Sequence, residues 1–279
     1  MKKISRRSFL AAAGLSVAAL ALTACGGSSA STASSVASSA ASSEAASTSA
    51  AAGELTTVEA GKLTMATNAA FPPYEMTTDA GEFEGIDIET AQAIADKLGL
   101  ELQIDDMDFD AALLSVQQGK ADIVMAGVTV TDERKAVMDF SDSYATGIQS
   151  IIVPEGSDIA SPDDLAGKKI GTQRGTTGYI YCSDDFGDDS VVAYDDGLTA
   201  VQALNNGQVD AVVIDNAPAQ EFVAANPGLV ILDTSYAEED YAIGMAKGSS
   251  LEDAVNAALK ELKADGTLQS IVDKYITAE

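Results

Sequence analysis

Residues 125–134, with the sequence MAGVTVTDER, begin as an apolar strand and end in two threonines, two acids and an arginine. This pattern predicts a buried strand that stops at Gly127 and leads directly into a helix that Thr131 caps, with Asp132 and Glu133 in its first turn. Polar groups that follow the end of such a strand lie at the ligand-binding edge of an open α/β sheet. The stretch therefore predicts a binding cleft at this point of the fold.

The surroundings of this stretch recur later in the chain. Residues 115–128 (SVQQGKADIVMAGV) and 203–216 (ALNNGQVDAVVIDN) share a helix, a glycine that ends it, an aspartate three residues later and an apolar strand. In both copies the strand finishes eight residues after the glycine, which is Gly119 in the first and Gly207 in the second. The similarity predicts two lobes built on one plan, whose strand ends face one another across a cleft.

Strand-like and helical segments alternate through the rest of the chain. We expect strands at 62–67, 101–104, 122–127, 151–153, 168–172, 191–194, 211–214 and 230–232, and helices at 86–98, 111–118, 198–205 and 251–274. This alternation indicates α/β lobes, each with a mostly parallel sheet flanked by helices.

The division into lobes follows from the same pattern. We expect residues 54–145 and 242–279 to form the first lobe and residues 146–241 to form the second. The chain would cross between the lobes near residues 144–148 and again near residues 239–243.

The first 53 residues differ in composition from the rest. Residues 1–24 carry a basic head and an alanine-rich apolar run, which predict a secretion signal. Residues 22–25 (LTAC) resemble a lipobox, so we expect Cys25 to be lipidated on the outer face of the cell membrane; an ordinary cysteine of a cleaved signal is the alternative. Residues 25–53 would form a disordered serine and alanine tether. Residues 5–10 (SRRSFL) resemble a twin-arginine signal, although the general secretory route also fits.

Composition excludes several classes of function. The net charge of −27 argues against a nucleic-acid partner by repulsion. The chain has no histidine, the commonest general base and a favoured zinc ligand, and we predict neither metal nor cofactor. Of its two cysteines, only Cys182 would remain after lipidation, so no intrachain disulfide is expected. We expect a monomer.

A carboxylate site is predicted from two stretches, one in each lobe. Arg134 lies one turn into the predicted helix, where its planar guanidinium could hold a carboxylate through two hydrogen bonds. Residues 171–179 (GTQRGTTGY) predict a strand, a glycine turn and a helix start, whose amides near Thr176 and Thr177 would accept the same anion. The turn lacks the lysine and spacing of a P-loop. Taken singly, a solvated arginine and an ordinary turn are the alternative interpretations.

An ammonium site is predicted beside it. Asp215 ends the apolar strand AVVID, where its charge needs a partner. A substrate ammonium would serve, held by Asp215, by Thr129 and by the carbonyl group of Gly127. Alternatively, Asp215 could cap the turn that follows it. Phe71 and Tyr74 of NAAFPPYE, together with Phe109, could line the aliphatic part of a ligand, although aromatic residues in such places are often part of a core.

Taken together, the motifs resemble those of a known family. They are FPPYE, FEGIDIETAQAIADKLG, FDAALLSVQQGKADIVMAGVTVTDERKAVMDFSDSY, DDLAGKKIGTQRGTTG, ALNNGQVDAVVID and VNAALKELKADGTLQSIVDKY. They are similar to those of the polar amino-acid-binding proteins of ABC importers, family 3 of the extracellular solute-binding proteins.

The resemblance implies a hinged two-lobe fold of the type II periplasmic-binding-protein (Venus-flytrap) kind. Arg134, Thr129 and Asp215 would hold the amino acid's charged groups, and Phe71 and Phe109 would sandwich the ligand.

The resemblance also bears on the ligand's side chain, which Gln173 and Asp87 would face. Asn68 stands where some members with basic ligands carry aspartate, which counts against lysine or arginine but leaves both open.

The predicted function is therefore that of an extracytoplasmic lipoprotein that captures an L-amino acid by lobe closure and delivers it to an ABC permease. An enzyme on the same fold, such as a dehydratase, is one alternative, with Glu75 and Asp87 as candidate acid and base and nothing in the sequence to pair them. A sensor is another, but the sequence up to Glu279 shows neither a membrane helix nor a signalling module after the binding region. Which amino acid binds, or whether cystine does, stays open.

Overall fold

The fold is described from a computed structural model, which places residues 55–276. The predicted signal peptide, Cys25 and the tether lie outside these residues. The first of two lobes contains a five-stranded sheet in the order β5-β1-β6-β14-β7. Its strands are β1 (Lys62–Thr67), β5 (Glu101–Asp106), β6 (Ile123–Val124), β7 (Met138–Phe140) and β14 (Gly244–Ala246).

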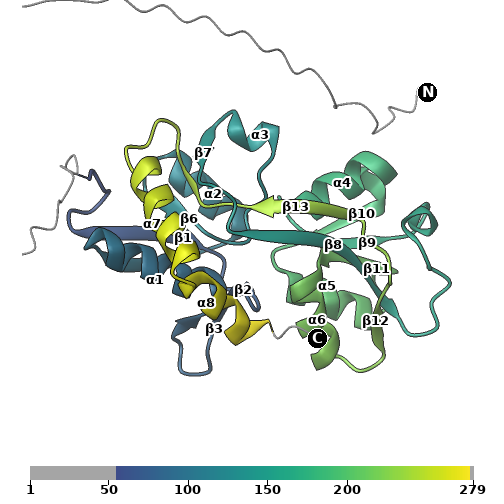
Figure 1. Cartoon of the computed structure of the whole chain (residues 1–279). Helices are drawn as coiled ribbons and strands as arrows, with labels where there is room; N and C mark the ends of the chain where they lie inside the picture. Colours follow the sequence, from purple (N-terminus) through teal and green to yellow (C-terminus); the bar gives the residue numbers. More distant parts are fainter. Residues whose placement is uncertain (1–54, 277–279) are drawn as a thin grey trace, which may run out of the picture. The chain divides into compact units, whose positions relative to one another are not determined.

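Helices cover both faces of this sheet (Figure 1). Leu63 and Met65 of β1 pack in the core shared with α1, α7 and α8, whereas Ala66 packs with α2, because successive side chains of a strand point to opposite faces. The helices of this lobe are α1 (Ile86–Leu98), α2 (Phe109–Gln117), the short α3 (Asp132–Lys135), α7 (Glu252–Ala264) and α8 (Thr267–Tyr275). A small sheet of β2 (Ala70–Phe71), β3 (Glu75–Thr77) and β4 (Phe83–Glu84) completes it.

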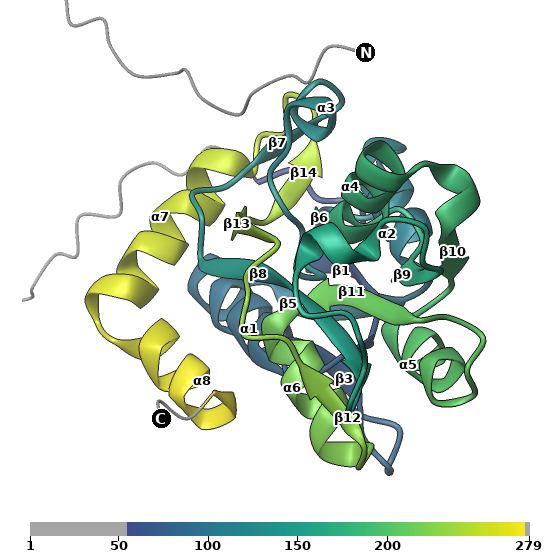
Figure 2. The ribbon, with the colours of Figure 1, turned by 90° about the vertical axis from the view of Figure 1, so that its right-hand side faces the viewer.

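The second lobe contains the other large sheet, in the order β10-β9-β11-β8-β12, with β13 also paired to β8. Figure 2 shows α4 and α5 on opposite sides of β9 and β11. The elements are β8 (Ala145–Pro154), β9 (Ile170–Gln173), β10 (Val191–Tyr194), β11 (Ala211–Asp215), β12 (Leu229–Ile231), β13 (Ala237–Tyr241), α4 (Thr177–Phe186), α5 (Gly197–Asn205), α6 (Asn216–Ala225) and two 3-10 turns, η1 (Pro162–Leu165) and η2 (Asp188–Ser190). Cys182 of α4 is buried in this core, and burial raises the pKa of its thiol to about 12.

The α/β class is as predicted, but the sheets are mixed and not mostly parallel. β1 pairs parallel with β5 and β6, and β9 pairs parallel with β10 and β11. The antiparallel pairings involve β8, β12, β13 and β14. β8 and β13 carry the chain from one lobe to the other, and β14 follows the return. β8, β13 and β14 therefore do not end strand-helix-strand units, the connections that make neighbours parallel, and β12 follows α6 but pairs with β8 instead of β11.

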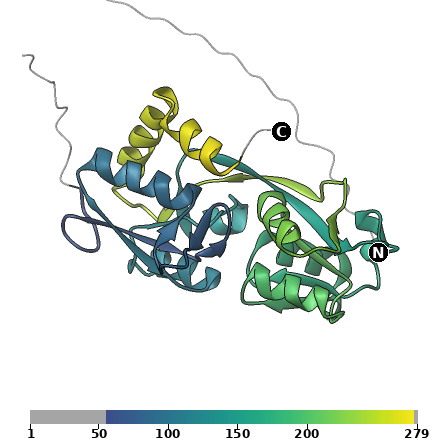
Figure 3. The same ribbon diagram turned by 90° about the horizontal axis from the view of Figure 1, so that it is seen from below.

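The chain crosses between the lobes in one antiparallel ladder. β8 and β13 pair with Thr146 opposite Asp240 and Ala145 opposite Tyr241, and Figure 3 shows this pair spanning the two lobes. Of the segments 144–148 and 239–243, where we expected the crossings, this ladder contains residues 145–148 and 239–241. Tyr241 is fully buried there, and a side-chain carbon at Gly147 would come within 2.5 Å of its ring. Glycine at 147 thus lets the two crossing strands pack closely.

The internal repeat is confirmed in its hydrogen bonding. Gly119 and Gly207 end their helices with φ angles of 66° and 67°. The carboxylate of Asp122 accepts the backbone N–H of Thr64 at 2.8 Å, and that of Asp210 accepts the backbone N–H of Lys169 at 2.8 Å. In each lobe the aspartate thus ties the start of one strand to its parallel neighbour.

The predicted elements are present, most of them with bounds that differ by one or more residues, and one strand is much shorter and one helix is broken. Helix α1 and strands β1 and β10 have the predicted bounds. The strand expected at 122–127 is reduced to Ile123–Val124, because the chain turns into the cleft beyond it. The helix expected at 251–274 is broken, because Gly266 adopts a left-handed conformation with φ 81° between α7 and α8. Within residues 55–276, no helix has the length and apolarity needed to cross a membrane.

Candidate functional site

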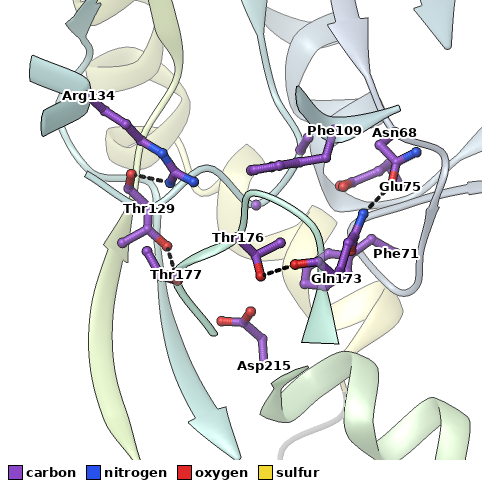
Figure 4. A pocket seen from close by; sticks show the side chains of 12 residues that line it. Asn68, Phe71, Glu75, Phe109, Thr129, Arg134, Gln173, Thr176, Thr177 and Asp215 are labelled. Carbon is purple, nitrogen blue, oxygen red and sulfur yellow. Dashed lines mark hydrogen bonds between the residues drawn. The ribbon is translucent and has the colours of Figure 1, made fainter. Parts of the chain in front are cut away.

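A pocket lies between the two lobes (Figure 4). Ten of the twelve ligand-binding residues predicted from the sequence line it, whereas Asp87 and Tyr74 do not. The lining consists of Asn68, Phe71, Glu75, Phe109, Ala126, Gly127, Thr129, Arg134, Gln173, Thr176, Thr177 and Asp215. Its volume is only about 10 Å³, far below what a small-molecule ligand needs, so this conformation is a closed one.

Arg134 is held at one end of the pocket by backbone carbonyl groups of both lobes. Thr131 caps α3 as predicted, accepting the N–H of Arg134 at 3.2 Å. The guanidinium Nη1 donates to the Thr129 carbonyl oxygen at 2.8 Å and Nη2 to the Gly175 carbonyl oxygen at 3.1 Å. It lies 5.4 Å from the ring centre of Phe109. Burial lowers the pKa of Arg134, and Glu239 opposes this. An arginine stays charged and has further N–H donors for an anion.

The start of α4 faces the pocket from the second lobe. The Thr176 hydroxyl accepts the N–H of Tyr179 at 3.3 Å and donates to the Gln173 carbonyl oxygen at 2.8 Å, so it caps the helix. The first amides of a helix have no acceptor within it and carry partial positive charge. Backbone N–H groups at Thr177 and Gly178 can therefore meet the anion that Arg134 attracts.

Glu239, which the sequence analysis missed, joins both lobes beneath the pocket. Its Oε2 accepts the hydroxyl groups of Thr129 at 3.1 Å and Thr177 at 2.8 Å, and Nε2 of Gln149 at 3.1 Å. A hydroxyl group has one hydrogen, so these two hydroxyl groups present only lone pairs to the pocket. No sequence motif signals Glu239, because its partners lie 62 to 110 residues away along the chain.

Asp215 adds a second acceptor beside these threonines. It occupies the N-cap position of α6, but its side chain makes no capping hydrogen bond, so the alternative capping role is not what the structure shows. Its Oδ2 accepts Nε2 of Gln149 at 2.8 Å, and Oδ1 has no donor within residues 55–276. Burial raises the pKa of Asp215 to about 7. A cation in the pocket would find Asp215 and both threonine oxygens.

The end of the pocket opposite Arg134 holds an amide pair, an aromatic ring and an acid (Figure 4). Nε2 of Gln173 donates to Oδ1 of Asn68 at 2.8 Å, which links the lobes. Nδ2 of Asn68 donates to the Met107 carbonyl oxygen at 2.9 Å. Phe71 packs against Gly127, where a side-chain carbon would lie 2.9 Å from its ring. Glu75 lines this end and is fully buried.

Asp87 and Tyr74 lie behind the pocket. The Oδ2 of Asp87 accepts the N–H of Gly127 at 3.0 Å and the hydroxyl of Tyr144 at 2.8 Å, so this carboxyl group braces the loop that forms the pocket. Tyr74 packs edge-on against Tyr241 with ring centres 5.2 Å apart. Sequence spacing placed both residues near the cleft, but their side chains point to the core between the crossing strands and the first lobe.

The arrangement suits a ligand with neighbouring opposite charges. Arg134 and the start of α4 supply donors for an anion. Asp215, Thr129 and Thr177 supply acceptors for a cation beside it. Within the described part of the chain, no group of three or more histidine, cysteine or acidic side chains could hold a metal ion. A mixed α/β fold with two lobes, two crossing strands and such a cleft defines a two-lobed solute-binding protein.

The comparisons place the chain within this class. Residues 63–278 match the family model of bacterial extracellular solute-binding proteins, family 3, and the chain belongs to this family. It is 33% identical over 226 residues to the L-cystine-binding protein TcyJ of Escherichia coli (strain K12), covering 79% of this chain and 85% of that protein.

Solved structures agree in fold. The arginine-, lysine-, histidine-binding protein ArtJ of Geobacillus stearothermophilus has a TM-score of 0.75 and 34% identity, with 78% of this chain and 96% of that chain covered. An ancestral arginine-binding protein bound to glutamine has a TM-score of 0.75 and 41% identity, covering 78% and 99%. The predicted type II periplasmic-binding-protein fold is thus confirmed.

Proposed function

We propose that this protein is an extracytoplasmic receptor that captures an L-α-amino acid by lobe closure and delivers it to an ABC permease. The observation that carries the proposal is the adjacency of two opposite subsites. Arg134 and the α4 amides would bind the α-carboxylate. Asp215, with the oxygens of Thr129 and Thr177, would bind the α-ammonium. Family members named for amino acids, among them cystine, arginine and histidine binders, support the same ligand class.

Lobe closure follows from how the closed pocket is built. Three direct contacts join the lobes at the pocket: Arg134 with Gly175, Thr129 with Thr177, and Gln173 with Asn68. An amino acid does not fit in about 10 Å³, so the lobes must separate to admit it. A ligand shifts this equilibrium only through contacts that it makes better in the closed state. The ligand-binding groups are divided between the two lobes, so a ligand can contact all of them only when the lobes are closed.

We propose that the protein is not an enzyme, in keeping with relatives that are binding proteins of transport systems. Glu75 and Asp87 were the candidate acid and base, and the structure does place them within hydrogen-bonding reach of each other. Asp87 is however turned away from the pocket by Gly127 and Tyr144. A pair with one member behind the pocket wall cannot exchange protons with two atoms of a substrate.

We also propose that the protein acts as a monomer anchored by a lipid on Cys25 to the outer face of the cell membrane. The lipobox-like residues 22–25 and the serine- and alanine-rich tether support this part of the proposal. A flexible tether would let the folded lobes reach a permease in the same membrane.

Calorimetric titration tests the function. The purified protein, stripped of bound ligand by unfolding and refolding, is titrated with the common L-amino acids and with cystine. We expect tight binding of one or a few amino acids, no chemical change of the ligand, and loss of binding in Arg134→Ala. Silence across the panel, or binding that is indifferent to Arg134→Ala, would overturn the proposal.

A further inference from the structure

A second cavity lies between the lobes, on the side of β8 and β13 where α6 and the end of α8 lie (Figure 1). We call it the rear cavity. Its walls come from the loop before β3 and the end of α8 in the first lobe, from the start of α6 in the second, and from residues of β8 and β13 between them. Its volume of about 430 Å³ is within the range of small-molecule sites, whereas the ligand pocket holds only about 10 Å³ in the same conformation. The rear cavity is therefore open while the ligand pocket is closed.

Asp215 and Tyr241 form the wall between the rear cavity and the ligand pocket. Asp215 lines both spaces. A side-chain carbon at Gly127, which lines the ligand pocket, would lie 3.4 Å from Cε2 of Tyr241. A side-chain carbon at Gly147, which lines the rear cavity, would lie 2.6 Å from the hydroxyl oxygen of the same tyrosine. The ring of Tyr241 thus stands between two spaces that both adjoin Asp215.

The charged side chains of the rear cavity are both acidic. They are Asp215 and Glu221, and no lysine or arginine is among the described residues that line it. Asp215 is only 8% exposed, and its Oδ1 has no donor within residues 55–276. Leaving a buried carboxyl oxygen unpaired is costly. A cation in the rear cavity would supply a partner for Asp215, and Glu221 would attract it as well.

Three tyrosine rings line the same cavity, and they belong to Tyr74, Tyr241 and Tyr275. Tyr74 and Tyr241 pack edge-on against each other. Tyr275 already attracts one cation of the protein, because Nζ of Lys274 lies 4.8 Å from its ring centre. Aromatic faces attract ammonium groups, and alkylated ammonium ligands are commonly bound among several such rings. Acidic groups and tyrosine rings together favour a small organic cation.

An anion at the start of α6 is disfavoured in this cavity. The Asp215 side chain makes no capping hydrogen bond, so the first amides of α6, at Asn216 and Ala217, have no acceptor within the helix. Such amides attract an anion where no acid stands beside them. Here Asp215 and Glu221 repel an anion from the same wall, and the next residue, Pro218, has no N–H group to donate. The balance of charge therefore favours a cation.

We propose that the rear cavity is a second binding site, separate from the ligand pocket, which takes a small organic cation of the alkylated-ammonium class. Asp215 and Glu221 are its counter-charges. The rings of Tyr74, Tyr241 and Tyr275 form its aromatic wall.

The two sites share one counter-charge. In the proposed function Asp215 also binds the α-ammonium group of the amino acid, and this part of the inference rests on that function. Two cations beside one carboxylate repel each other, and each weakens the attraction that the carboxylate exerts on the other. Coupling of this kind is reciprocal and has a limit, commonly about 5–150-fold in affinity. We expect a cation in the rear cavity to lower amino-acid affinity by about tenfold and no further.

The first test titrates the purified protein calorimetrically with choline, with tetramethylammonium and with 3,3-dimethyl-1-butanol. The last compound has the shape of choline with a neutral carbon in place of the charged nitrogen. Choline should bind at least about tenfold tighter than this neutral compound, a difference of about 1.4 kcal/mol, which contacts between cations and aromatic rings can supply. Equal affinities, or no binding of either cation, would overturn the site.

Variants of α6 locate the bound cation. Ala217→Trp fills the rear cavity and should abolish choline binding, and Glu221→Gln should weaken it by about fivefold or more through the loss of a charge. Neither residue lines the ligand pocket, so both variants should bind the amino acid as the wild type does. Glu155→Gln, an exposed acid of the same lobe that does not line the cavity, is the matched control and should bind choline normally. Choline binding that survives both α6 variants would overturn the location, and Glu221→Gln decides alone if Ala217→Trp fails to fold.

Competition titrations show whether the two sites are separate. The amino acid is titrated at increasing choline concentrations, and its affinity should fall to a plateau. A fall that continues in proportion to the choline concentration would place choline in the ligand pocket and overturn the second site. An unchanged affinity would overturn the sharing of Asp215.

The outcomes keep this inference distinct from the proposed function. Choline binding that Ala217→Trp abolishes, in a protein that binds no amino acid, would overturn the proposed function and leave the rear site standing. Amino-acid binding without any binding of choline or tetramethylammonium would overturn the rear site and leave the receptor standing.

Discussion

Thr129 of the first lobe and Thr177 of the second bring their hydroxyl oxygens to 3.5 Å from each other, above one oxygen of Glu239. Glu239 lies on β13, one of the two strands that cross between the lobes. The contact therefore forms only when both lobes come together at these crossing strands. One carboxylate oxygen therefore takes part in closing the pocket and in turning both hydroxyl lone pairs toward the ligand.

Replacing Glu239 should weaken ligand binding without removing an atom that lines the pocket. In Glu239→Gln one acceptor oxygen is replaced by an amide donor, so the two threonine hydroxyl groups can turn their hydrogens toward the pocket. We expect affinity for the amino acid to fall about tenfold, the worth of one hydrogen bond to a charged group. The fall should be smaller for the deaminated analogue of the same ligand. Glu238→Gln, exposed on the same strand, is the matched control, and an equal fall for both ligands would contradict the orienting role.

Arg134 should need its planar shape as well as its charge. The guanidinium bridges carbonyl oxygens of both lobes while it faces the pocket, which a single ammonium group cannot do. We expect Arg134→Ala to cost about 2–5 kcal/mol of binding free energy and Arg134→Lys to recover only part of it. Calorimetry would measure both. Lys135→Ala, on the exposed side of the same helix, should bind normally, and full recovery by lysine would argue against the bridging geometry.

Stability of the ligand-free protein should fall as the pH rises. Burial raises the pKa of Asp87 to about 6 and of Asp215 to about 7, so the folded state binds more protons than the unfolded state between about pH 4 and these values. Their stabilising contribution is fully present below pH 4 and is lost as the pH rises through 6 and 7. The melting temperature, checked by calorimetry, should be higher near pH 5 than near pH 8, by about 2–4 °C for each kcal/mol. Asp215→Asn should flatten this dependence.

Gly147→Ala should disturb the packing of β8 against β13, the two strands that cross between the lobes. The added carbon would come within 2.5 Å of the Tyr241 ring, which is fully buried and cannot move aside freely. We expect a loss of about 1–3 kcal/mol in the free energy of unfolding, which denaturant titration would measure. Thr146→Ala, exposed on the same strand, should change stability by much less. A wild-type stability for Gly147→Ala would mean that the crossing strands adjust easily.

The proposed lipid anchor is tested by Cys25→Ala. The lipobox-like segment predicts that the wild-type protein partitions with membranes and incorporates labelled fatty acid. The variant should incorporate none and should appear in the soluble extracytoplasmic fraction. Membrane retention of the variant without label would point to another attachment.

The sequence determined the local elements and much of the pocket lining. Helix α1 and strands β1 and β10 follow from apolar periodicity and from glycine at the helix end, which act over a few neighbouring residues. The repeat centred on Gly119 and Gly207 predicted two lobes, because like segments fold into like units. Residues at strand ends, such as Thr129 and Asp215, could be assigned to a cleft because strand ends converge in such sheets.

Only the tertiary structure decided the direction of the crossing strands and the partners of buried charges. The antiparallel pairing of β8 and β13 joins distant segments, which local periodicity does not encode. Glu239 became part of the site only when folding brought Thr129, Thr177 and Gln149 to it. Asp87 turned out to support Gly127 from behind, and Glu75 to face the pocket. Burial and hydrogen bonding between distant residues decide such roles, because the cost of an unpaired charge depends on its surroundings in three dimensions.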